Sequence, residues 1–173
     1  MKKAFILAAI LFTLLPMQSY GDEPADIYEM KGKSIPTFNL DDIHGKKYKM
    51  RDHLGKVILV NFFYVGCKPC EMELPILNKI KKSLPADKFE LTIINGINQK
   101  PEEIKEFFRN IDVSELNAII DSIGVQVKRF NVTRYPTSFL INKKGVIVEA
   151  FAGFPMGFED SLSKRIKELI DEE

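Results

Sequence analysis

The apolar positions of the chain alternate between continuous runs and helically spaced stripes, which predicts alternating strands and helices. Residues 56–65 are predicted to form a strand that is apolar on both faces from Val57 onward apart from Asn61, a pattern typical of a central strand in a covered sheet. Residues 67–84 carry apolar side chains three or four positions apart, which predicts a helix that Pro85 ends. The buried stripe of this helix is Leu74, Leu77, Ile80 and Leu84.

The rest of the chain continues the same alternation. Further strands are predicted at 89–94, 116–120, 137–141 and 146–151, and helices over 124–130 and from Pro101 and Phe158 onward. Residues 37–40 and 46–50 flank the turn-like segment 41–45 and predict an N-terminal hairpin. Elements in this order predict an α/β sandwich.

Residues 1–21 show the three-part pattern of a secretory signal peptide. Two lysines follow Met1, Ala4–Leu15 is apolar apart from one threonine, and Ser19-Tyr20-Gly21 puts small residues at the cleavage-type positions. The apolar stretch is shorter than the about 20 residues that span a bilayer. We expect cleavage and a periplasmic or otherwise extracytoplasmic protein, with an uncleaved membrane anchor as the alternative. Residues 22–33 are expected to be a loose lead-in, and residues 34–173 one domain.

The net charge of the chain narrows the range of binding partners that the protein is expected to have. The full chain has a formal net charge of +1, and removal of Lys2 and Lys3 with residues 1–21 leaves 23 basic against 24 acidic side chains. A near-neutral protein of this kind is not expected to bind nucleic acid or an anionic membrane surface. Export would also place its thiols in an oxidising compartment.

Cys67 and Cys70 are the only cysteines, and they stand as Cys-Lys-Pro-Cys between a predicted strand and a predicted helix. A helix N-terminus offers unpaired N–H groups and partial positive charge, which favour thiolate over thiol. The position predicts dithiol–disulfide exchange. Cys67 would be the more exposed nucleophile, and Cys70 the buried thiol that resolves the mixed disulfide.

Two alternatives stay open for this pair. The first is a structural disulfide, which would restrict the unfolded chain little across so short a loop. The second is a metal site, with Cu(I) favoured over zinc because soft thiolates suit it. Only His44 and His53 could add imidazole ligands, and both lie in polar, turn-like stretches.

Four further positions are candidates for supporting roles. Lys68 adds a positive charge that would lower the pKa of the Cys67 thiol, unless it is an ordinary solvated lysine. Glu73, three residues past Cys70, could accept the Cys70 proton, or could be an exposed helix glutamate. Asn61 is expected to be buried and hydrogen-bonded. If the Tyr135–Pro136 bond is cis, the Tyr135 backbone could pair with a substrate strand.

Taken together, these motifs resemble the thioredoxin superfamily, and within it the exported TlpA/ResA-like branch. The resemblance covers residues 34–171 and rests on Cys-x-Pro-Cys-x-x-Glu at 67–73, Tyr-Pro-Thr-Ser-Phe-Leu-Ile at 135–141, Asn-Lys-Lys-Gly at 142–145 and Ala-Gly at 152–153. It implies a central mixed β-sheet flanked by helices, with an N-terminal hairpin, an inserted helix near 101–110, and a cis Pro136 facing the cysteines.

The resemblance also implies an activity. Members of the branch are thiol-disulfide reductases that need no cofactor and are kept reduced by a membrane electron-donor protein. Their substrates are disulfides of other exported proteins, and cytochrome c maturation is their best-known role. The resemblance makes Cys67, Cys70 and Glu73 the expected catalytic residues of a protein that we expect to be monomeric.

This chain departs from the family pattern on the expected docking surface. Gly66 stands where the family usually has tryptophan, and Tyr135 is unusual before the proline. With Lys68 and Pro136 they form the expected substrate-docking set. Peroxiredoxins share the fold but have threonine three residues before their reactive cysteine. Tyr64 occupies that position here, which predicts against peroxidase chemistry.

Overall fold

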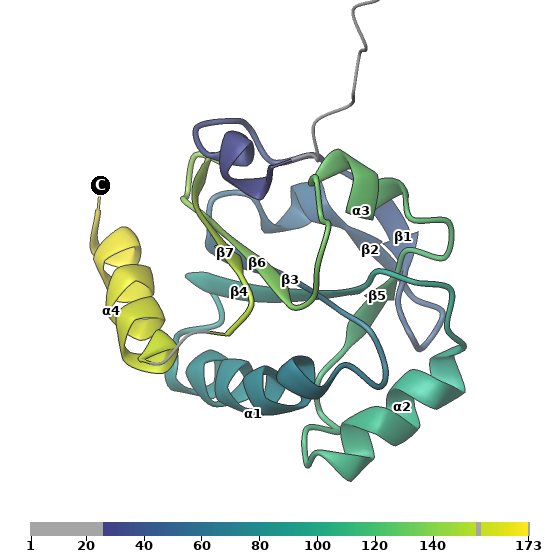
Figure 1. The fold of residues 1–173 in the computed structure, drawn as a ribbon. Helices are drawn as coiled ribbons and strands as arrows, with labels where there is room; N and C mark the ends of the chain where they lie inside the picture. The colour runs from purple at the N-terminus through teal and green to yellow at the C-terminus, as the bar shows by residue number, and fades with distance from the viewer. Residues whose placement is uncertain (1–25, 155–156, 173) are drawn as a thin grey trace, which may run out of the picture.

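The computed structural model describes residues 26–154 and 157–172, so the expected signal peptide over residues 1–21 lies outside the described residues. A five-stranded sheet in the order β5-β4-β3-β6-β7 lies between two layers of helices and loops (Figure 1). β3 pairs in parallel with β4 and antiparallel with β6. The strands are β3 (Val57–Phe63), β4 (Phe89–Asn95), β5 (Ala118–Ile120), β6 (Thr137–Ile141) and β7 (Ile147–Ala152). The expected mixed sheet is confirmed.

The central strand β3 is apolar at every position except Asn61 because it contributes to two cores. Its seven residues are all buried. Leu59 and Phe63 join the core under α1, α2 and α4, while Ile58 and Phe62 join the core on the opposite face. Successive side chains of a strand point to opposite faces, so a strand covered on both sides needs apolar residues at nearly every position.

Three helices cover one face of the sheet, and Figure 1 shows two of them below it and the C-terminal one, in yellow, at its left. They are α1 (Lys68–Ser83), α2 (Pro101–Asn110) and α4 (Phe158–Asp171), while the short helix α3 (Val125–Arg129) lies on the other face. α2 begins with a proline and with the Glu103 carboxylate accepting the Lys100 N–H at 2.9 Å. No helix among the described residues is long and apolar enough to cross a membrane.

Segments from the N-terminal part of the chain lie against both sheet edges. The predicted hairpin forms as β1 (Asn39–Asp41) and β2 (Lys47–Lys49), and Asp42 bridges to Ile119 of β5. At the other edge, Ser34 bridges to Val146 beside β7. Covered edges do not offer a free strand to other chains.

The lead-in expected over residues 22–33 is more regular in its described part than the sequence suggested. Residues 27–30 form the 3-10 helix η1 (Ile27–Met30), with Ile27 and Met30 buried in the core around β3 and β6. The Gly32 N–H donates to the carbonyl of Ile147 at 2.8 Å. Two apolar anchors and two backbone hydrogen bonds with Ile147, the second from the Ile147 N–H to the Lys33 carbonyl, fix a segment that has too few apolar residues to show periodicity.

Phe63 should carry much of the packing between α2 and the sheet, since its ring stacks on Phe107 and Phe108 with centroids 6.0 and 5.5 Å away. We expect Phe63→Ala to lower the free energy of unfolding of the oxidised protein by about 3–5 kcal/mol in a urea titration. Ile123→Ala, at a side chain that is 84% exposed, should change it by less than about 0.5 kcal/mol. Similar losses for the two variants would contradict this account of the core.

Candidate active site

The cysteine pair lies at the junction between the end of β3 and the start of α1. Cys67 is the N-cap of α1, and its sulfur accepts the Cys70 N–H at 3.3 Å. The two sulfurs form a disulfide with an S–S distance of 2.04 Å and a Cα–Cα distance of 5.2 Å. Cys67 was expected to be the more exposed thiol, but the two cysteines hardly differ, with Cys67 2% exposed and Cys70 0% exposed. In this disulfide form both cysteines are buried.

The start of β6 adds a second wall to the site. The Tyr135–Pro136 bond is cis, as the sequence predicted. Thr137 pairs with Phe62 in the antiparallel register of β3 and β6. Pro136, one residue earlier, therefore lies beside the end of β3 that leads into Cys67. Tyr135 donates its hydroxyl to the Gly96 carbonyl at 3.1 Å, and its ring meets Tyr64 edge-on at 5.2 Å. The topology thus brings together residues that directly follow β3 and β4 and directly precede β6, at one end of these central strands.

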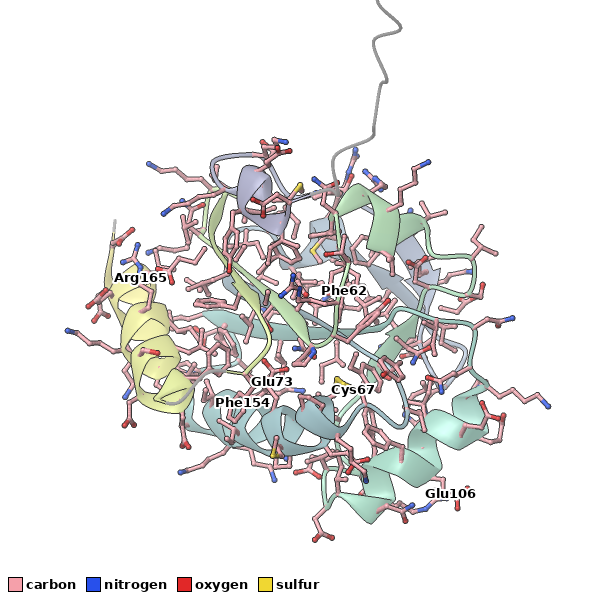
Figure 2. The ribbon with its side chains drawn as sticks, viewed as in Figure 1. Phe62, Cys67, Glu73, Glu106, Phe154 and Arg165 are labelled. Atoms are coloured by element: carbon pink, nitrogen blue, oxygen red, sulfur yellow. A yellow bond between two sulfur atoms is a disulfide. The ribbon has the colours of Figure 1, made fainter. Side chains whose placement is uncertain are left out.

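Glu73 is buried, which excludes the alternative of an exposed helix glutamate. Its side chain lies between α1 and the sheet, near Cys67 in Figure 2, and is 0% exposed. Asn61 donates to one carboxylate oxygen at 2.7 Å, and Ser138 donates to the other at 3.4 Å. Asn61 also donates to the Ser138 hydroxyl at 2.9 Å, so three elements meet at this carboxyl.

Burial raises the pKa of Glu73 to about 7, although the hydrogen bonds from Asn61 and Ser138 oppose the shift. A carboxyl with this pKa exchanges its proton near neutral pH, which suits general acid–base work. Glu73 lies one helical turn past Cys70, on the face that both residues bury. The arrangement gives the deeper cysteine a nearby group that can accept a proton.

Lys68 and Gly66 lie at the surface beside the disulfide. The Lys68 side chain is 83% exposed, and its ammonium contacts the Glu71 carboxylate at 2.8 Å. Glu71 offsets the positive charge that the sequence assigned to this position, so the helix N-terminus is the main influence left on Cys67. Gly66 is exposed with φ of +96°, a backbone conformation that side chains rarely adopt.

One contributor to the site was missed by sequence reasoning. The Gln99 side-chain oxygen accepts the N–H of Val65 and an N–H of Asn95, both at 2.8 Å. The Gln99 amide also donates to the Val65 carbonyl at 3.3 Å. Gln99 therefore holds both backbone groups of a residue two positions before Cys67. The sequence did contain one indication of this role. Two polar residues, Asn95 and Gln99, lie at the carboxyl end of β4, which runs parallel to β3 and so ends near the active site.

The histidines lie with other partners. His53 stacks on Tyr48 at 4.6 Å and approaches the Glu90 carboxylate at 3.3 Å. His44 lies in the β1–β2 turn, where its N–H donates to Asp42. Within residues 26–154 and 157–172, no three His, Cys, Asp or Glu side chains are grouped as metal ligands would be.

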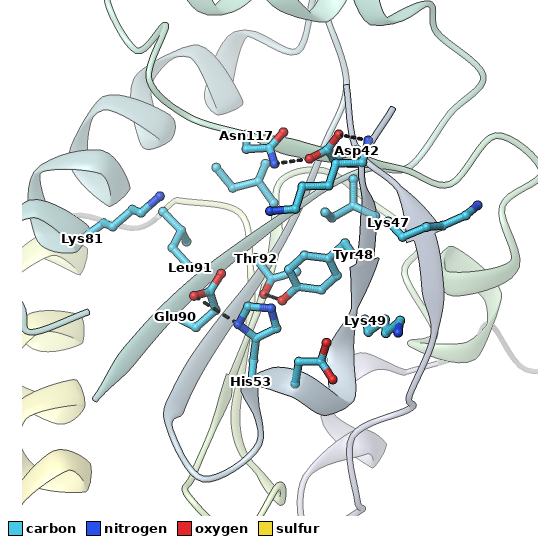
Figure 3. Close-up of a pocket in the computed structure, with 14 residues that line it drawn as sticks. Asp42, Lys47, Tyr48, Lys49, His53, Lys81, Glu90, Leu91, Thr92 and Asn117 are labelled. Atoms are coloured by element: carbon cyan, nitrogen blue, oxygen red, sulfur yellow. Dashed lines mark hydrogen bonds and ion pairs between the residues drawn. The ribbon is translucent and has the colours of Figure 1, made fainter. Parts of the chain in front are cut away.

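A polar pocket of about 430 Å³ lies apart from the cysteines, between the hairpin and β4 (Figure 3). The Tyr48 and Thr92 hydroxyls share a hydrogen bond of 2.6 Å within it. Four lysines and three carboxylates are mixed along its walls, so neither sign of charge dominates: Lys46, Lys47, Lys49 and Lys81 against Asp42, Asp52 and Glu90. No cysteine lines this pocket, so the disulfide lies outside it.

Comparison with known proteins agrees with this geometry. Residues 31–150 match the AhpC/TSA family model. The chain is 30% identical to the thiol-disulfide oxidoreductase ResA of Bacillus thuringiensis subsp. konkukian (strain 97-27), over 86% of this chain and 82% of that one.

Solved structures give the same result. One is a protein assigned as the thiol:disulfide interchange protein DsbE from Chlorobium tepidum, with a TM-score of 0.73 and 26% identity over 81% of this chain and 97% of that one. Another is the exposed lipoprotein thioredoxin Etrx1 of Streptococcus pneumoniae strain TIGR4, with a TM-score of 0.67 and 26% identity over 78% and 100% of the two chains. The chain therefore belongs to the AhpC/TSA family, as a thioredoxin-like thiol-disulfide oxidoreductase with Cys67 and Cys70 as its cysteine pair.

Proposed function

We propose that this protein, in its dithiol form, reduces disulfides in other exported proteins. The observation that carries the proposal is the Cys67–Cys70 disulfide at the N-terminus of α1, above the buried carboxyl of Glu73. A helix N-terminus favours a thiolate on Cys67, and a carboxyl that titrates near neutrality can serve Cys70. The helix N-terminus would thus favour the thiolate of Cys67 as the nucleophile, and the carboxyl would accept the proton of Cys70 as the resolving thiol.

The exchange runs in two steps that balance. The Cys67 thiolate attacks one sulfur of the substrate disulfide, forming a mixed disulfide and releasing the other substrate sulfur as a thiolate that takes up a proton. Cys70 then loses its proton to the Glu73 carboxylate and attacks the Cys67 sulfur. The second substrate sulfur leaves as a thiolate and takes up a proton, the substrate disulfide has gained two electrons and two protons, and the Cys67–Cys70 disulfide has formed.

Export and partners complete the proposal. The N-terminal pattern at residues 1–21 supports secretion, and one structural neighbour is named an exposed lipoprotein. In an oxidising compartment the pair stays oxidised unless electrons are supplied, so we propose a membrane electron-donor protein as the second partner. The resemblance to the TlpA/ResA-like branch makes cytochrome c maturation the process we propose. Tyr135, Pro136, Gly66 and Lys68 would form the surface on which the substrate docks.

The first prediction tests the function against copper delivery by the same thiols. The protein with a free Cys67–Cys70 dithiol should reduce insulin disulfides with dithiothreitol as electron source, seen as turbidity, and Cys67→Ser should abolish the reaction. Reduction fails without Cys67 because no nucleophile remains at the helix N-terminus. A protein that binds one Cu(I) tightly and leaves insulin intact would instead support the copper function.

The second prediction assigns the nucleophile. In the Cys70→Ser variant, Cys67 should react with iodoacetamide with an apparent pKa within about 3.5–7.5, the range for cysteines at helix N-termini. In Cys67→Ser, the remaining Cys70 should react more slowly at pH 6, because it lies inside the first turn and is fully buried. Alkylation rates measured from pH 4 to 9 decide the matter, and faster labelling of Cys70 at pH 6 would reverse the assignment.

The third prediction concerns Glu73. Its pKa of about 7 lies above the ordinary value of 4.5, so the native state binds this proton more tightly than the unfolded state does. The resulting stabilisation is complete below pH 4.5 and is lost as pH rises through 7. Between pH 4.5 and 8, Glu73→Gln should therefore remove a fall in unfolding free energy on the order of 3 kcal/mol. It should also slow release of the mixed disulfide.

The control for Glu73 is Glu71→Gln, in the same helix but partly exposed. It should keep the fall in stability with pH and the resolution rate of the natural protein. Urea titrations of the oxidised proteins at each pH measure stability, and acid-quenched single turnovers measure resolution. If Glu73→Gln keeps both pH dependences, the carboxyl has no part in resolution.

A further inference from the structure

A groove of about 330 Å³ runs beside the active-site loop. Its lining comes from the chain just before Cys67, from the segment after β4 and from one face of α2: Val65, Gln99, Glu103, Glu106, Phe107 and Asn110. Because Val65 is two residues from Cys67, the groove begins next to the disulfide. Glu106 lies on the exposed side of α2 in Figure 2.

The charges of α2 are separated between its two sides. Glu103 and Glu106 line the groove, whereas Lys105 and Arg109 line a different hollow, near the hairpin turn. Among the described residues, Glu106 makes no ion pair, and the nearby cation Lys68 is engaged by Glu71. The groove is therefore negative, and its apolar lining is Val65 and Phe107, of which Phe107 is 6% exposed.

The groove is also held rigidly. Phe107 stacks on Phe63 at the end of β3, so the α2 wall is fixed to the sheet. Gln99 makes hydrogen bonds to both backbone groups of Val65, which fixes the opposite wall to the segment after β4. A preformed site avoids the ordering cost that a flexible surface meets on binding.

We propose that this groove binds a cationic segment of the substrate protein, with lysine or arginine close to the disulfide that is reduced. The proposal rests on the reductase function proposed above and adds a substrate class to it. The methylene stem of lysine or arginine would pack against Val65 and Phe107, and the charged head would reach Glu106 and Glu103. Docking there places the adjacent substrate disulfide beside Cys67.

The test uses two disulfide-bearing peptides that differ only in three lysines or three glutamates beside the cysteines. The dithiol form of the full chain is mixed with each, and second-order rate constants are taken from acid-quenched samples. We expect the lysine peptide to react roughly tenfold faster at low salt, with the preference shrinking as salt is added. Glu106→Gln should reduce the preference roughly threefold, as loss of one exposed charge pair would.

Glu102→Gln is the matched control, since this residue is exposed on the same helix but does not line the groove. It should keep the preference for lysine. Equal rates for the two peptides, or equal effects of the two variants, would overturn the groove proposal. So would a dimer in sedimentation that Glu106→Gln dissociates, because a second copy would then fill the groove. Failure to reduce either peptide and a small aromatic disulfide would overturn the reductase function itself.

Discussion

The hydrogen bonds around the Glu73 carboxyl connect the parts of the molecule on which the site depends. Asn61 reaches it from β3, Ser138 from β6, and Glu73 itself belongs to the helix that carries both cysteines. A carboxyl without such partners would be costly to bury. The hydrogen bonds to this carboxyl hold α1 against the sheet and align the start of β6 with the end of β3. The contact that buries the acid therefore also positions the disulfide.

The same burial separates the chemistry of the two thiols. Cys67 caps α1, where unpaired N–H groups favour negative charge. Cys70 lies inside the first turn of α1. One helical turn further along is the carboxyl of Glu73, whose pKa burial raises to about 7. A negative Glu73 would oppose a thiolate on Cys70, whereas a neutral one would not. Protonation of one buried acid can thus set the order in which the thiols react.

Apolar periodicity was sufficient to predict β3, α1 and the succession of strands and helices along the chain, because each buries long continuous or helically spaced runs. It could not predict the burial of Glu73, since spacing gives the face of a residue but not the depth to which that face is covered. The Gln99–Val65 bonds were missed because a side chain that pairs with backbone leaves no periodic signal. The ion pair of Lys68 with Glu71 likewise depends on rotamers rather than spacing.

In the proposed function, recognition and electron transfer would use separate parts of this fold. Glu73 and Asn61 are buried with the cysteines, so in this proposal they would act on the sulfurs without contacting a substrate surface. The exposed carboxylates of α2 lie on a helix whose own core contact is Phe63, at the end of β3. Surface substitutions on α2 can therefore change which proteins dock while leaving the buried acid and the disulfide in place. A rigid redox centre with a variable rim lets one chemistry serve different substrates.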